Sequence, residues 1–295
     1  MKDIINAIIQ GIIQGLTEFL PVSSDGHLSI YQHFSKSVVG EGMGNSMFMT
    51  VMLHLGTLIA VFVVFRKKIN ELLYEAFSML IDIFKGKFTW RGMSPTRRMV
   101  VMLLISLFPL VIVLPFKDFI EGLAEDADIF VEGFCFLFTS VLLFLAVGAS
   151  GKGSKKNKIG TRDALVIGSF QALAPMPGIS RSGSTISSAL FCGIDRETAV
   201  QFSFIMGIPA ILAANILDIK EAVEAKESIN LLPLIIGIII AAIVGFFAIK
   251  LIELLIKKNK FIIFAVYTLI LGILVICEAT FELFAGKNII EYLAG

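Results

Sequence analysis

Long apolar runs separated by short charged clusters make up most of this chain. Six runs are long enough to cross a bilayer as helices, since about 20 apolar residues span its hydrocarbon core. They cover residues 47–65, 99–116, 130–147, 198–217, 231–252 and 261–277. A mixed stretch at 69–86 predicts a further short helix, either amphipathic or within the membrane. The pattern therefore predicts an all-α integral membrane protein with about six transmembrane helices.

Two more apolar stretches are broken in the middle. Residues 1–20 stop at Pro21, and the chain restarts at Ser23-Ser24-Asp25, residue types that favour a helix N-terminus. Residues 164–192 repeat this pattern around Pro175, Pro177 and Gly178. Broken backbone at membrane depth is tolerated only where it is buried in protein or lines a cavity. We therefore expect two re-entrant helix hairpins.

The two broken segments match each other at a constant offset of 157 residues (171 minus 14). At this offset Gln14 matches Gln171, Ser23 matches Ser180, and Gly26 matches Gly183. The match predicts two internal repeats, at about 1–150 and 160–290, within a single membrane domain that covers residues 1–295.

Clusters of Lys and Arg predict the orientation of the repeats. The loops at 66–98, 152–162 and 257–260 are basic and should be cytoplasmic, whereas the acidic loop at 118–128 and the mixed loop at 218–228 should lie outside. The span at 47–65 then runs inward, and its partner at 198–217 runs outward. The repeats are thus expected to have inverted topology, and in such folds the binding site lies near the midplane where broken helices meet.

Composition supports the membrane assignment. Of 295 residues, 56% are hydrophobic and 17% are charged, and the mean hydropathy is +0.87. A soluble domain cannot bury that much apolar surface. The net charge of +1 gives no electrostatic reason to expect nucleic-acid binding.

The first break carries groups suited to acid–base chemistry. Gln14 and Glu18 lie four positions apart and share one helix face, and Ser24 and His27 share a face of the following helix. Ionisable groups at membrane depth are costly, so each needs a partner or a function. We expect the carboxylate, the hydroxyl and the imidazole to converge across the break.

The second break has the composition of an anion-binding site. Its sequence combines Arg181, several hydroxyls and flexible glycines at the start of a helix, whose backbone amides favour negative charge. The expected binding residues are Gly178, Ser180, Arg181, Ser182, Gly183 and Thr185, joined by Ser23 of the first break. Together the two breaks suit phosphoryl transfer, in which positioning and charge neutralisation do most of the work.

Simpler roles remain open for several of these residues. Instead of a role in chemistry, Glu18 could serve only as a structural carboxylate paired with Arg181. Ser23 is alternatively only a helix cap, and Asp25 only an anion in the first helical turn. His54 lies inside a predicted span, where it either touches the site or serves packing and hydrogen bonding.

The segments Gln14-Gly-Leu-Thr-Glu18-Phe-Leu-Pro-Val-Ser-Ser-Asp-Gly-His27 and Pro177-Gly-Ile-Ser-Arg-Ser-Gly183 closely resemble the bacterial undecaprenyl-diphosphate phosphatases of the bacitracin-resistance family. The first segment matches that family's Glu/Gln-x-x-x-Glu and Pro-Val-Ser-Ser-x-Gly-His signatures. The second matches its Pro-Gly-x-Ser-Arg-Ser-Gly signature. Two departures are Gln14, which removes one potential metal-binding carboxylate, and Asp25, which stands where the family often has Thr.

The resemblance implies hydrolysis of undecaprenyl diphosphate to the monophosphate at the outer face of the bacterial plasma membrane. This reaction recycles the lipid carrier of peptidoglycan synthesis and gives tolerance to bacitracin, which sequesters the diphosphate. The resemblance also implies a divalent cation, Mg²⁺ or Ca²⁺. Its candidate ligands are Glu18, Gln14 and Asp25.

On this reading Ser24 is the first choice as nucleophile, with His27 as general base and later acid, and Glu18 orienting His27 or holding the cation. Two rival mechanisms make His27 the nucleophile with Glu18 as base, or use an activated water. A different class of function is also open, because inverted repeats with broken helices are typical of transporters. In this alternative, the protein is a flippase that moves a polyprenyl phosphate across the bilayer. A homodimer is an open alternative to a monomer, since the sequence does not determine the oligomeric state.

Overall fold

The structure, a computed structural model, is built from helices. It describes residues 2–39, 47–90, 92–116, 122, 129–149, 156–224, 230–258 and 260–294. Its helices are α1 (Lys2–Thr17), α2 (Ser24–Val39), α3 (Met47–Phe84), α4 (Pro95–Val113), η2 (Leu114–Phe116), α6 (Phe130–Ala149), α7 (Thr161–Gln171), α8 (Arg181–Phe191), α9 (Arg196–Glu224), α10 (Leu231–Lys257), α11 (Ile262–Ala285) and α12 (Ile289–Ala294). Within these residues, strand-type pairing is limited to one bridge between Lys156 and Ile194.

Among the residues that the structure describes, six helices are long and apolar enough to cross a membrane, in agreement with the predicted number of spans. They lie at Phe48–Phe84, Pro95–Val113, Phe130–Ala149, Arg196–Ile216, Leu231–Ile256 and Ile262–Ala285. A helix satisfies its own backbone hydrogen bonds, as a lipid environment requires. The last span is longer than the sequence pattern predicts, and the short α12 that follows it was not predicted.

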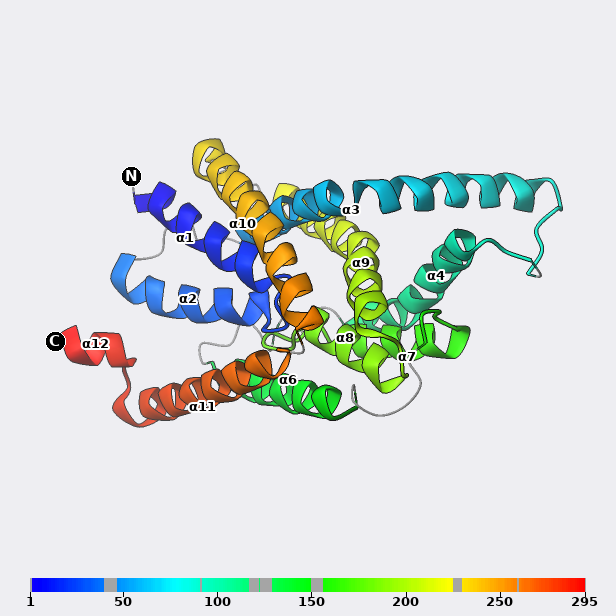
Figure 1. Cartoon of the computed structure of the whole chain (residues 1–295). Coiled ribbons are helices and arrows are strands. Elements are labelled where there is room, and N and C mark those ends of the chain that lie inside the picture. Colours follow the sequence, from blue (N-terminus) through cyan, green and yellow to red (C-terminus); the bar gives the residue numbers. More distant parts are fainter. Residues whose placement is uncertain are drawn as a thin grey trace.

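The predicted short helix at 69–86 is the second half of α3. The helix continues from the first span across a bend at Phe65, whose backbone (φ −100°, ψ 17°) is not helical. The stretch is therefore helical as expected, but it is joined directly to the span and is not an independent element (Figure 1).

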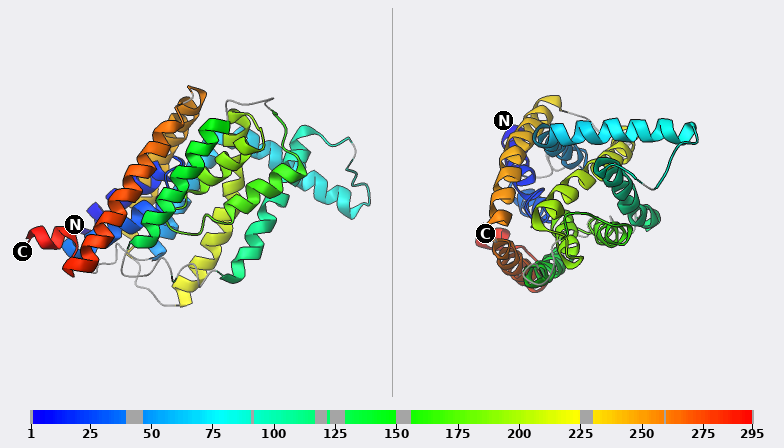
Figure 2. Two further views of the ribbon diagram at one scale, coloured as in Figure 1. Left: turned by 90° about the horizontal axis from the view of Figure 1, so that it is seen from below. Right: turned by 45° about the vertical axis from the view of Figure 1, so that its right-hand side comes forward.

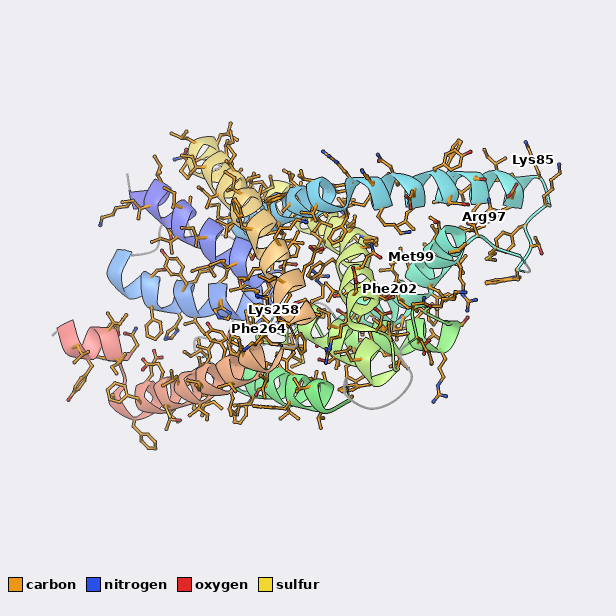
Figure 3. The ribbon with its side chains drawn as sticks, in the orientation of Figure 1. Lys85, Arg97, Met99, Phe202, Lys258 and Phe264 are labelled. Atoms are coloured by element: carbon orange, nitrogen blue, oxygen red, sulfur yellow. The ribbon has the colours of Figure 1, made fainter. Side chains whose placement is uncertain are left out.

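Helices from the two halves of the chain are interleaved (Figures 1 and 2). The helix α1 packs on α10, and α7, the corresponding helix of the second half, packs on α4. The helix α6 packs on α11, and α3 packs on α9 and α10. Phe202 and Phe264 are buried in the main apolar core (Figure 3). Outward-facing side chains such as Phe108, Phe134 and Phe247 stay exposed, as expected for helices that face lipid.

Both predicted breaks are present. The chain turns between Thr17 and Ser24, and again between Gln171 and Arg181. The two breaks touch through glycines, because a Cβ atom on Gly26 would lie 2.8 Å from the Cα atom of Gly178. Only a residue without a side chain allows this approach at position 26.

Some sequence predictions fall on residues outside the described part. These are most of the acidic loop at 118–128, residues 152–155 of the basic loop, and residues 225–228 of the mixed loop.

Candidate active site

Residues from the two breaks meet in a buried ion pair. The Nη2 atom of Arg181, at the start of α8, lies 2.9 Å from Oε1 of Glu18, which follows α1. Glu18 is 6% exposed, and a buried carboxylate needs such a partner to remain charged. The fold therefore joins the carboxylate and the cation that the sequence placed in separate segments.

The second oxygen of Glu18 accepts hydrogen bonds from its own segment. Ser24 donates its hydroxyl to Oε2 at 2.7 Å, and the Nε2 atom of Gln14 donates to the same oxygen at 3.1 Å. The backbone N–H of Glu18 bonds to the carbonyl of Gln14 at 3.0 Å, so the last turn of α1 sets this geometry. The Ser24 hydroxyl is thus bonded directly to a carboxylate that can accept its proton.

His54 belongs to this cluster, a role that the sequence left open. Its Nε2 atom lies 3.5 Å from Oε2 of Glu18 and 3.5 Å from Oδ1 of Asp25. Its Nδ1 atom lies 2.9 Å from the carbonyl oxygen of Thr50, which can only accept. Two carboxylates on one side and a carbonyl on the other suit a ring that donates from both nitrogens, the imidazolium form. The available signal was a lone histidine inside an apolar span.

His27 has partners other than Ser24. Its Nδ1 atom lies 2.6 Å from the carbonyl oxygen of Ser23, so Nδ1 must donate. In the neutral ring Nε2 then accepts, and it lies 2.7 Å from the hydroxyl of Tyr267 on α11. The His27 and Tyr267 rings are stacked with centroids 5.7 Å apart, and Phe136 meets His27 edge-on. Sequence reasoning missed Tyr267, whose only signal was a hydroxyl within an apolar span.

Ser23 has a strained backbone between these groups. Its φ of 70° is the one positive φ among the described residues other than glycine, a region that costs free energy for residues with a side chain. Its hydroxyl accepts from the N–H of Gly26 at 3.3 Å, so Ser23 does cap α2. Its carbonyl holds His27 in place. Strain of this kind is often found at functional sites.

The hydroxyls of the second break mainly support its backbone. Ser180 caps α8 by accepting from the N–H of Gly183 at 3.0 Å, and its own N–H bonds to Thr139 at 3.1 Å. Ser182 donates to the carbonyl of Leu20 at 3.2 Å and ties the two breaks together. Gly178 adopts a φ of 93°, and its carbonyl accepts from Thr139 at 3.0 Å.

The Arg181 side chain is fixed by contacts with α9, on the side away from Glu18. Its Nη1 atom donates to the carbonyl of Ser203 at 3.3 Å, and its guanidinium packs against Gly207, where a Cβ atom would overlap it. Thr185 lies one turn further along α8 and shares a 2.6 Å hydrogen bond with the Ser203 hydroxyl. The cation is thus aimed at the first break by contacts with α9.

Within the described residues there is no group of three or more His, Cys, Asp or Glu side chains placed to hold a metal ion. One observation nevertheless fits a cation. The Oε1 atom of Gln14 is buried without a hydrogen-bond partner in the described part of the chain. It is an amide oxygen beside the Glu18 carboxylate, and Mg²⁺ and Ca²⁺ prefer oxygen ligands. Such a site suits a cation held by few protein groups and by substrate phosphates.

Six apolar spans around a buried cluster of carboxylate, hydroxyl and guanidinium groups define a polytopic membrane protein with an enclosed polar site. The chain belongs to the bacitracin resistance protein BacA family, whose profile matches residues 7–274. This match confirms the resemblance drawn from the two motifs.

Curated relatives cover nearly the whole chain. It is 39% identical over 273 residues to the undecaprenyl-diphosphatase of Alkaliphilus metalliredigens, with 92% of this chain and 96% of that protein aligned. It is 38% identical over 275 residues to undecaprenyl-diphosphatase 4 of Bacillus thuringiensis, with the same coverage. It is 37% identical over 284 residues to the undecaprenyl-diphosphatase of Methanobrevibacter smithii, with 96% of this chain and all (100%) of that protein aligned.

Proposed function

We propose that this protein hydrolyses undecaprenyl diphosphate to undecaprenyl phosphate and phosphate. In doing so it recycles the lipid carrier of peptidoglycan synthesis and gives resistance to bacitracin. The observation that carries the proposal is the contact of one carboxylate, Glu18, with both Ser24 and Arg181. A hydroxyl beside a base and a fixed cation is the arrangement that phosphoryl transfer needs.

The substrate would divide between two environments. Its prenyl chain would lie in lipid along the apolar outer faces of the spans, and its diphosphate would reach the Glu18–Arg181 cluster. Arg181 would donate to phosphate oxygens in a planar fork. The N-terminus of α8, at Arg181 and Ser182, adds the positive end of a helix dipole that favours an anion. The N–H groups of Ser180 and Gly183 are bound within the second break and shape this helix end.

Ser24 would attack the terminal phosphorus while Glu18 Oε2, at 2.7 Å, accepts the hydroxyl proton. The bond from that phosphorus to the bridging oxygen breaks, and undecaprenyl phosphate leaves. Water, deprotonated by His27, then attacks the phosphoserine phosphorus and the bond from phosphorus to Ser24 Oγ breaks. Glu18 returns its proton to that oxygen, and the proton on His27 leaves with the phosphate or to solvent. The sequence favoured His27 as the base. The described contacts of the Ser24 hydroxyl favour Glu18 in the first step and leave His27 for the water of the second.

His54 and Asp25 complete the charge balance. Glu18 and Asp25 are negative, and Arg181 and an imidazolium at His54 are positive, so the resting site is close to neutral. A diphosphate adds further negative charge. Gln14, Glu18 and Asp25 would hold a divalent cation together with the diphosphate, and that cation would supply charge neutralisation.

The proposal includes an inverted repeat with the site open to the outer face of the plasma membrane. The reciprocal packing of α1 on α10 and of α7 on α4 supports the repeat, and the outer-face opening rests on the distribution of Lys and Arg among the loops. Gly11 and Gly168, which are 157 residues apart (168 minus 11), also support the repeat. A Cβ atom on Gly11 would lie 2.8 Å from the carbonyl oxygen of Gly237 on α10, and one on Gly168 would overlap the carbonyl of Ser106 on α4.

A flippase for polyprenyl phosphate is the second candidate, because the same site would bind the same head group. Phosphate release by purified protein in detergent distinguishes the two, since no transport is possible there. The assay compares wild type, Glu18→Ala and, as a matched control, Ser169→Ala on the exposed side of α7, each with and without Mg²⁺. We expect release from wild type and the control alone. Lipid translocation in vesicles without any phosphate release would overturn the enzymatic proposal.

Trapping the phosphorylated enzyme identifies the nucleophile. Rapid acid quenching with diphosphate lipid labelled in the terminal phosphate should leave the label on Ser24, and Ser24→Ala should abolish it. A label on His27 would exclude Ser24 as nucleophile. An enzyme that turns over without any label would favour direct attack by water.

A further inference from the structure

The second half of α3 lies across the bundle. In the right-hand view of Figure 2, α6 and α11 are seen close to end-on, whereas this half of α3 (cyan) crosses the view and extends beyond the other helices. The bend at Phe65 produces the change of direction. If α6 and α11 cross the membrane, residues 66–84 run along its surface.

One face of this segment is apolar and exposed. Leu73, Phe77, Leu80 and Phe84 are spaced by four, three and four positions, so they share one helix face. All four are at least half exposed, and Phe84 reaches 89%. An apolar stripe of this kind marks an interaction surface.

The polar face of the segment is bound by the chain itself. Arg97 of α4 donates from Nε to Glu75 at 3.0 Å, from Nη1 to Asp82 at 2.7 Å and from Nη2 to Ser78 at 2.9 Å. Figure 3 shows Arg97 on α4 below this helix and Lys85 at its far end. The clamp offsets one of the two negative charges of Glu75 and Asp82 and fixes the rotation of the helix. The apolar face is therefore held outward.

Basic residues lie at both ends of the segment. Arg66 and Lys67 begin it, Lys85 and Lys87 follow it, and all four are exposed. Within the described residues, no ion pair is found for these four side chains. Basic residues beside an apolar helical face are typical of helices that lie in the interface of an anionic membrane.

We propose that residues 66–90 form an interfacial anchor that inserts the face of Leu73, Phe77, Leu80 and Phe84 into an anionic phospholipid layer. Its basic ends bind the phosphate head groups. A second copy of the chain fits this face less well, because pairing two such faces would bring uncompensated basic ends together. The anchor acts independently of phosphate hydrolysis, since none of its residues contacts Glu18, Ser24 or Arg181 in the described interactions.

Trp90 provides a local probe because it is the single tryptophan of the chain. It is 66% exposed, packs on Phe88 and is the last residue of the proposed anchor. The protein is placed in nanodiscs that hold one copy, made of phosphatidylcholine alone or mixed with phosphatidylglycerol. We expect lipids brominated on the acyl chain to quench Trp90, and acrylamide to reach it less in the anionic discs. Replacing Arg66, Lys67, Lys85 and Lys87 with Gln should remove this dependence on phosphatidylglycerol. Each lost charge should weaken the equilibrium binding of the segment to the anionic surface by about fivefold.

The matched control replaces Lys258 and Lys260, basic residues of another loop, with Gln and should leave Trp90 unchanged. Phosphate release at the wild-type rate verifies that each variant is folded. Equal acrylamide access in both lipids, without quenching by brominated lipid, would overturn the proposal. So would shielding of Trp90 that appears only in discs holding two copies, because that result assigns the apolar face to a dimer contact.

Discussion

Arg181 and Glu18 form a 2.9 Å ion pair although 163 positions separate them in the chain. Neither half of the protein contains the site alone. The proposed nucleophile Ser24 and the proposed base Glu18 come from the first break, and the guanidinium of Arg181 comes from the second. Assembly of the two halves is therefore a precondition for any chemistry here.

Arg181→Lys should lower kcat by about two orders of magnitude, comparable to the loss of one fixed donor in a water-excluded site. An ammonium keeps the charge but cannot bind Glu18 and phosphate oxygens as a planar fork. Steady-state phosphate release in detergent measures the effect, with Arg98→Lys on the exposed side of α4 as control. Near-normal turnover would show that point charge alone suffices.

Gly207→Ala tests the position of Arg181 without changing any charge. The added methyl group would overlap the guanidinium, which is the flexible end of its side chain and can move aside. We expect activity to fall by about tenfold or more, with little change in thermal stability. Gly148→Ala is the matched control, because a Cβ atom there has no neighbour within 4 Å. Unchanged activity in Gly207→Ala would contradict the requirement for this orientation.

His54→Gln should reduce kcat/KM by about tenfold, because it removes the positive charge that faces Glu18 and Asp25. Glutamine keeps a neutral donor but loses the positive charge. His33→Gln is the control, since His33 pairs with Glu282 at 2.9 Å outside this cluster. Equal effects of the two substitutions would indicate a general loss of stability, which a thermal melt would detect.

Tyr267→Phe isolates one hydrogen bond to His27. Phenylalanine can keep the stacked ring but loses the hydroxyl that lies 2.7 Å from Nε2. We expect about a fivefold decrease in the rate of phosphoenzyme hydrolysis, the value of one ordinary hydrogen bond, with phosphorylation of Ser24 unchanged. Single-turnover kinetics separates the two steps. A decrease confined to phosphorylation would place His27 in the first step, as the sequence predicted.

Hydrophobic length predicts the six spans, because a lipid environment leaves few alternatives to a helix. Proline and glycine within two further apolar stretches predict both breaks. It also places Glu18, Ser24 and Arg181 in irregular segments where polar groups require a purpose. The site contacts of His54 and Tyr267 depend on how α3 and α11 pack around those segments. No local pattern records that packing. The second half of α3 was ambiguous for a related reason, since its direction depends on the bend at Phe65 and on the Arg97 clamp.

The partners of His27 are a second case in which a local sequence pattern does not determine the contacts of a side chain. Spacing placed Ser24 and His27 on one helix face, which favoured a direct contact between them. The positive φ of Ser23 aims its carbonyl at Nδ1, and the ring is then shared with Tyr267. Backbone strain at one residue thus decides which neighbour the imidazole meets, and composition carries little information about it.

The helices α2 and α8 begin at Ser24 and Arg181, and these residues are 157 positions apart (181 minus 24), the offset that relates the two breaks. The proposed nucleophile and the proposed phosphate clamp therefore occupy equivalent positions of the two predicted repeats. An ancestor assembled from two identical copies would have carried the same residue at both positions. Divergence after gene fusion, with Ser in one copy and Arg in the other, would turn a symmetric pair of helix ends into an asymmetric catalyst.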